Sequence, residues 1–193
     1  IAAGVAPNSL DAVCCTHLHG DHILGLPGLL GTMGMDDRQR PLRLIGPSGL
    51  SDLLDGLART PALHVSFDLV IDELDPAALQ DTEATALKPI GHLRVGAVPL
   101  DHRVPTIGFR FDGANAPGSL DLKRLDQLGV PRGPLLGQLQ RGESVTAPDG
   151  RTVEPSEVTG PSRAATPLAF ADDTPPCGGG ASIDADADLL VHE

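Results

Sequence analysis

Three histidines and an aspartate lie within six consecutive positions near the start of the sequence: His17, His19, Asp21 and His22. Neutral imidazole and carboxylate groups are the ligands of catalytic zinc, and zinc sites with coordination positions open to water carry out hydrolysis. Chance or a solvated loop seldom produces so many ligands at such spacing. The run therefore predicts a metal centre with hydrolytic chemistry.

The spacing of these four residues favours two ions over one. In an extended segment, residues two apart point the same way, so we expect His17, His19 and Asp21 to face one cavity. We expect His22 to be displaced toward the start of a following helix. Four ligands so close in sequence do not wrap one tetrahedral ion, whereas two ions about 3.5–4 Å apart can share the cavity. A water bridging such ions has a lowered pKa and supplies hydroxide at neutral pH.

The remaining ligands must come from later strand ends. His102 follows a strand expected over residues 92–100, and Asp173 ends a strand expected from about residue 167. An aspartate between two cations can bridge them, because a carboxylate has two oxygens. Asp172 is an alternative to Asp173 for this role, and the residue pattern alone leaves the choice open.

Strands alternating with helices, and ligands at the strand ends, predict a layered α/β domain. The sequence predicts helices over residues 23–33 and 46–57, with Ser48 as the N-cap of the second, and a loop at the three consecutive glycines 178–180. Besides the two strands named above, we expect strands over residues 10–15, 42–45, 66–74, 104–111 and 188–191.

Residues 113–162 differ in character from the rest of the chain. They are rich in Pro and Gly, with a helix expected near 120–128 and a hairpin signal at 148–150. Together with Arg163 at its edge, the segment holds six basic and six acidic residues, so the rest of the chain carries the net charge of -12. We interpret the segment as an inserted arm.

Length and composition fit one globular domain of 193 residues with 40% hydrophobic and 2% aromatic residues. The sequence contains no long apolar stretch and no basic-then-apolar leader, so we expect a cytoplasmic protein without a membrane partner. It begins without Met and stops directly after a strand-like run. We therefore expect a piece of a longer protein.

The motif His17-x-His19-x-Asp21-His22 resembles that of the metallo-β-lactamase fold, a four-layer αβ/βα sandwich. In its extended form over residues 16–30, THLHGDHILGLPGLL, it resembles the ribonuclease Z family of tRNA 3′-processing endonucleases. The resemblance covers nearly the whole chain, with further matching segments at residues 46–50, 99–102, 104–109, 133–137, 141–144, 170–174 and 189–193.

The resemblance implies two Zn²⁺ ions per subunit and a role for each site residue. One zinc would be held by His17, His19 and His102, the other by Asp21 and His22, with Asp173 as the bridge. Asp21 would also act as a general base that orients the hydroxide, and His192 would assist protonation of the leaving oxygen.

The resemblance also implies partners. Residues 113–162 match a flexible arm that binds precursor tRNA, and members of the family are commonly homodimers. Five basic residues of the arm are candidates for phosphate contacts, with a solvated surface as the alternative of equal weight: Lys123, Arg124, Arg132, Arg141 and Arg151.

The chain departs from the family pattern at three points. Residues 171–174 read Ala-Asp-Asp-Thr, where the family usually has Gly at the position of Asp172. The family's upstream strands are missing, and so is the downstream histidine that completes the second zinc site. We therefore expect a sandwich that is incomplete at its N- and C-termini.

Three functions remain as hypotheses. The first is a zinc-dependent endoribonuclease that cleaves the 3′ trailer of precursor tRNA by metal-activated hydroxide attack on a phosphodiester. The second is a hydrolase of the same fold that acts on a small phosphodiester or ester. The third is a truncated domain that binds metal without turnover. The acidic pI of about 4.8 argues against nucleic-acid binding, although the arm is nearly neutral.

Overall fold

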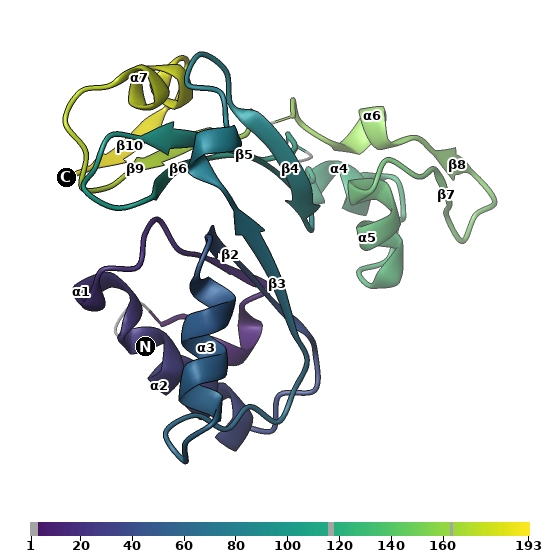
Figure 1. Ribbon diagram of the computed structural model, residues 1–193. Helices are drawn as coiled ribbons and strands as arrows, with labels where there is room; N and C mark the ends of the chain where they lie inside the picture. Colours follow the sequence, from purple (N-terminus) through teal and green to yellow (C-terminus); the bar gives the residue numbers. More distant parts are fainter. Residues whose placement is uncertain (1–3, 116–117, 163) are drawn as a thin grey trace. The chain divides into compact units, whose positions relative to one another are not determined.

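A computed structural model describes residues 4–115, 118–162 and 164–193. The chain falls into two compact units (Figure 1), one formed by residues 1–112 with 166–193 and the other by residues 113–165. The first unit contains the histidine run, and the second contains the segment interpreted as an arm.

The first unit contains a parallel three-stranded sheet of β1 (Ala12–Cys14), β2 (Leu42–Pro47) and β3 (Leu69–Leu74), in the order β1-β2-β3. Side chains alternate across its strands, so Leu42 and Leu44 face one side and Ile45 the other. Three helices pack their apolar side chains on the Leu42 side: α1 (Gly20–Ile23), α2 (Gly25–Met35) and α3 (Leu50–Ala58).

A five-stranded sheet forms the second half of this unit, in the order β10-β9-β6-β5-β4. Neighbouring strands are antiparallel except β9 and β10, which are parallel. The helix α7 (Gly178–Asp184) packs through Ile183 on its outer face. The strands are β4 (Thr85–Ile90), β5 (Leu93–Leu100), β6 (Thr106–Asp112), β9 (Leu168–Ala171) and β10 (Leu189–His192).

A third apolar cluster joins the inner faces of the two sheets, through Ile45 of β2 and through Val95, Ile107 and Phe109 of β5 and β6. The first unit is therefore four layers deep, with helices, sheet, sheet and helix in succession. Two short 3₁₀-helices complete it, η1 (Pro7–Ser9) and η2 (Pro76–Ala78). Among the described residues, no helix is both long and apolar enough to cross a bilayer.

The second unit has an apolar core of its own, which includes Leu125, Leu139 and Val153. The predicted hairpin signal lies between its two short strands, where the Ala147 N–H donates to the Arg151 carbonyl at 2.8 Å. Its elements are α4 (Leu122–Gln127), α5 (Pro134–Gln140), β7 (Val145–Thr146), β8 (Thr152–Val153) and α6 (Pro155–Val158).

The prediction that Ser48 caps a helix from residue 46 is wrong. The strand β2 continues to Pro47, and α3 begins at Leu50 after Gly49, whose φ is 99°. The orphan N–H groups at this helix start are satisfied from β3 instead, because Oε1 of Glu73 accepts from Gly49 at 3.0 Å and from Ser51 at 2.7 Å.

The loop predicted at residues 178–180 is also wrong, since the three glycines open α7. A Cβ atom on Gly179 would lie 2.0 Å from the Pro99 carbonyl oxygen, so a helix can lie this close to β5 only with glycine there. The strand β4 was not predicted. It lies at the sheet edge, where Pro89 is tolerated beside a shift in register.

Candidate metal centre

The loop that follows β1 is anchored to both sheets of the first unit. The Cys15 N–H donates to the Ile45 carbonyl of β2 at 2.7 Å, and the Ile107 N–H of β6 donates to the Thr16 carbonyl at 2.9 Å. The Thr16 hydroxyl lies 3.1 Å from Nδ1 of His17. The Thr16 contact orients the His17 ring through Nδ1, while Nε2 lies 3.3 Å from Oδ2 of Asp173.

Four of the predicted ligands come together at the ends of three strands. His17 and His19 follow β1, His102 follows β5 and Asp173 follows β9, and each offers one ligand atom within 4.8 Å of the others. The ring centroids of His19 and His102 are 5.0 Å apart, with Nδ1 of His19 3.2 Å from Nε2 of His102. Such a convergence of nitrogen and oxygen donors can hold a cation.

The environment of His17 fits a zinc ligand. Its side chain is fully buried, and Nε2 has no hydrogen-bond partner among the described residues. Oδ2 of Asp173 lies 3.3 Å away but outside hydrogen-bond geometry. Burial and then the neighbouring His22 lower the pKa of His17, and Asp173 opposes this shift only in part. A neutral ring with an unpartnered buried nitrogen is the form of histidine that binds zinc.

His22 faces inward from α1, while Asp21 lies at the exposed edge of the group. The helix begins at Gly20, so the two-residue alternation of the loop ends at His19. Oδ2 of Asp21 is 3.6 Å from Nε2 of His22, but the Asp21 side chain is 80% exposed and that of His22 only 24%. The expectation that Asp21 faces the cavity with His17 and His19 is therefore wrong, whereas His22 lies in the first helix, as expected, and faces inward from it.

The turn after β9 places two carboxylates on either side of the His22 ring. Oδ2 of Asp173 is 3.2 Å from Nε2, and Oδ2 of Asp172 is 3.2 Å from Nδ1. Asp173 has a φ of 51°, a left-handed conformation that aspartate tolerates better than most residues. Asp173, and not Asp172, belongs to the group with His17, His19 and His102.

His192 and Glu193, at the end of the sequence, differ in whether they lie near other potential ligands. His192 is exposed on β10 and lines a separate cavity of about 200 Å³ with Cys177. No ligand group among the described residues includes His192. The carboxylate of Glu193, the residue that follows His192, lies within 4.8 Å of those of Asp172 and Asp173.

The basic residues of the second unit are mostly engaged with acidic or polar neighbours. Ion pairs join Arg132 to Asp126 at 3.9 Å, Arg141 to Glu143 at 3.0 Å and Arg151 to Glu157 at 2.7 Å. Arg124 donates to the side chain of Gln127, and Lys123 is exposed on α4. Exposed pairs of this kind contribute about 0–1 kcal/mol each, so a phosphate can displace the acidic partner at low cost.

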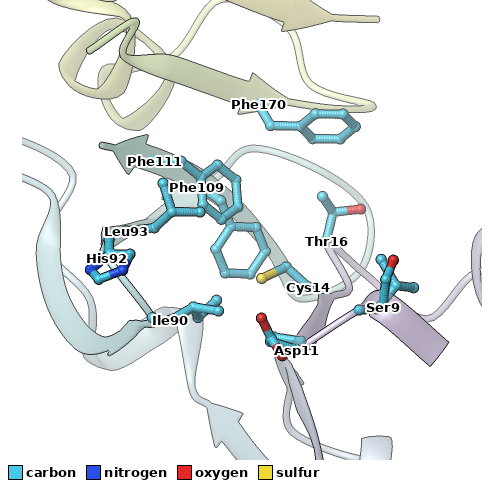
Figure 2. A pocket seen from close by; sticks show the side chains of 13 residues that line it. Ser9, Asp11, Cys14, Thr16, Ile90, His92, Leu93, Phe109, Phe111 and Phe170 are labelled. Carbon is cyan, nitrogen blue, oxygen red and sulfur yellow. The ribbon is translucent and has the colours of Figure 1, made fainter. Parts of the chain in front are cut away.

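One cavity of the first unit is lined by residues other than those of the histidine group. It has a volume of about 720 Å³ and is mainly apolar. Figure 2 shows the rings of Phe109, Phe111 and Phe170 around it, with His92 at its margin. None of the residues lining it belongs to a group of potential metal ligands, so we assign the chemistry to the histidine group.

Comparison with known proteins agrees with this architecture. Residues 3–118 match the model of the β-lactamase superfamily domain. A ribonuclease Z of Salinibacter ruber is 41% identical over 99% of this chain and 58% of its own length. A ribonuclease Z of Lactiplantibacillus plantarum is 36% identical over 97% of this chain and 58% of its own length.

A solved structure of similar fold is that of human tRNase Z, short form. It has a TM-score of 0.60 and 22% sequence identity, over 97% of this chain and 59% of that one. The predicted metallo-β-lactamase-like α/β fold is thereby confirmed. The chain spans about six tenths of the length of the curated relatives named above.

Proposed function

The chain belongs to the β-lactamase superfamily, and from this premise we propose that it is the catalytic part of a zinc-dependent endoribonuclease acting on precursor tRNA. The observation that supports this most directly is the buried, unpartnered Nε2 of His17 among the donor atoms of His19, His102 and Asp173. The names of the ribonuclease Z relatives point to RNA as the substrate class, and precursor tRNA follows from the family resemblance.

The proposed reaction is hydrolysis of the phosphodiester that joins the tRNA to its 3′ trailer. Bound zinc ions would supply Lewis acidity, neutralising charge on the phosphate oxygens and favouring ionisation of water. His17, His19 and His102 would hold one ion, Asp21 and His22 the other, with Asp173 between them. The Thr16 hydroxyl at Nδ1 of His17 keeps that ring oriented for the task.

Two further residues have proposed proton-transfer roles. The exposed carboxylate of Asp21 is free to orient an attacking water at the edge of the site. His192 would protonate the leaving oxygen, a role that follows from the resemblance alone. The homodimer and the cytoplasmic location implied by the resemblance also stay predictions.

Precursor tRNA with a 3′ trailer, incubated with the zinc-loaded protein, tests the proposal. We expect a single cut at the 3′ end of the tRNA and hydrolysis of a chromogenic phosphodiester. The Asp21→Ala variant should lose both activities, while Asp55→Ala, which removes an exposed carboxylate of α3, should keep both. Hydrolysis of the small ester without cleavage of tRNA would favour the small-molecule hydrolase instead.

The second unit is proposed to bind the tRNA away from the scissile bond. Its separate core supports this, because none of the apolar clusters of the first unit contains a described residue of 113–162. Deletion should lower cleavage of precursor tRNA far more than hydrolysis of the chromogenic ester. Equal losses would assign the segment a structural role.

A further inference from the structure

The carboxylate of Asp172 has no role in the ligand set proposed above. It lies on the side of the His22 ring opposite Asp173, with Oδ2 3.2 Å from Nδ1. Its side chain is only 14% exposed, compared with 80% for Asp21. A carboxylate so enclosed requires a partner that donates hydrogen bonds or carries positive charge.

The surroundings of Asp172 offer one such partner. Among the residues that the structure describes, no Lys or Arg forms an ion pair with Asp172, Asp173 or Glu193, although the three carboxylates lie within 4.8 Å of one another. The ring of His22 is the cation or donor that faces Asp172. The separation of 3.2 Å is within N–H···O hydrogen-bonding distance, although the contact, like that between His17 and Asp173, is a close charge pair that lies outside hydrogen-bond geometry.

We propose that Asp172 is a positioning residue for His22: it accepts the Nδ1–H of the ring and so directs the Nε2 lone pair toward a metal ion beside Asp173. Histidines that bind metals commonly donate their other ring N–H to a carboxylate, which fixes the tautomer and the orientation of the ring. His17 has the corresponding support from Thr16. The two inward rings are thus held by different groups, a hydroxyl for one and a carboxylate for the other.

This role accounts for a departure of the sequence from the family pattern. The position of Asp172 is expected to be Gly in the resembling family, and Gly has no side chain that reaches His22. Asp172 therefore adds support to the metal position that includes Asp21 and His22. The inference rests on the metal-binding part of the proposed function and not on its RNA substrate.

Zinc affinity, measured by chelator competition, separates positioning from direct ligation. Asp172→Ala should lower the affinity for the second zinc by about 10–100-fold, with the first zinc unaffected. Asp172→Asn should retain most of the affinity, because its amide oxygen can still accept the Nδ1–H. Asp112→Ala, which removes a partly buried carboxylate paired with Arg110 on β6, is the matched control and should leave both affinities unchanged.

Nitrogen NMR of the His22 ring in the zinc-loaded protein gives a second readout. The wild type and Asp172→Asn should carry the proton on Nδ1, a result that remains informative if Asp172→Ala fails to fold. Wild-type affinity in Asp172→Ala, an Asn variant as weak as the Ala variant, or a proton on Nε2 would overturn the inference. If the expected zinc affinities and ring proton are found but the wild type does not cleave precursor tRNA, the result counts against the RNA substrate only.

Discussion

The Nε2 atom of His17 and the Oδ2 atom of Asp173 lie 3.3 Å apart, although one residue follows β1 and the other follows β9. The two strands belong to different sheets, so this distance depends on how the sheets pack. The anchoring bond from Ile107 of β6 to Thr16 spans the same interface. A change that disturbs the packing of the two sheets should therefore also disturb the candidate metal centre.

Zinc should stabilise the folded protein through His17. A ligand that binds only the folded state at 100 times its dissociation constant adds about 2.7 kcal/mol to the free energy of unfolding. We expect zinc to raise the thermal midpoint of the wild type relative to the chelator-treated protein. His17→Ala should lose most of this rise, and the exposed His64→Ala should keep it. An equal rise in all three proteins would contradict the assignment.

Replacing Gly179 should be costly and replacing its neighbour should not. The Cβ of Gly179→Ala would meet the Pro99 carbonyl at 2.0 Å, so we expect a loss of about 1–3 kcal/mol as α7 is forced away from β5. In Gly180→Ala the nearest atom is Sγ of Cys177 at 3.6 Å, an ordinary contact, and stability should hold or rise. Urea unfolding of both variants measures this difference. Similar free energies of unfolding would show that the close approach of α7 to β5 does not require glycine at position 179.

Glu73 should make the stability of α3 depend on pH. Hydrogen bonds from the Ser51 backbone lower the pKa of Glu73 below its ordinary value of 4.5, against an opposing contribution from burial. A lowered folded-state pKa gives stability that is complete above the unfolded pKa and lost as pH falls through the folded one. Glu73→Gln should therefore cost about 0.3–1 kcal/mol at neutral pH, and the difference should vanish in acid.

Urea unfolding of the wild type and of Glu73→Gln, measured from neutral pH down into acid, provides the free energies of unfolding to compare. The exposed Glu83→Gln serves as the control and should show little difference at any pH. A Glu73→Gln effect that persists unchanged in acid would mean that the carboxylate charge is not its source.

The three thiols should differ in reactivity toward iodoacetamide. Burial raises the pKa of Cys14 to about 12 and that of Cys15 to about 11. Burial also acts on Cys177, but a hydrogen bond between its thiol and the Thr174 hydroxyl, together with one from the Gly180 N–H, outweighs burial and lowers the pKa of that thiol. Because the thiolate is the reactive form, Cys177 should be modified first.

Peptide mass spectrometry at neutral pH would follow this modification. Thr174→Val, which removes the hydroxyl, should slow alkylation of Cys177 without changing the rates at the other two cysteines. Faster labelling of Cys14 or Cys15 would contradict the predicted order.

The sequence predicts which residues come together at the candidate metal centre better than it predicts the contacts that hold the surrounding elements in place. Strand-end position and the family resemblance predict that His102 and Asp173 join the histidine run, and the structure brings both side chains beside His17 and His19. The support that Glu73 gives to α3, and the approach of Asp172 to His22, join segments distant in sequence and have no local signal. The helix α7 was missed because glycine disfavours helices on average, whereas packing against Pro99 demands it at Gly179.

The φ of 51° at Asp173 limits what evolution can place there. Asparagine, aspartate and glycine are the residues that enter this backbone region most readily, and only aspartate among them brings an anionic oxygen. Glutamate, the obvious acidic replacement, has no such preference for the left-handed region. Backbone geometry and metal chemistry thus favour the same amino acid for separate reasons. The other residues that fit this backbone conformation readily, asparagine and glycine, carry no negative charge.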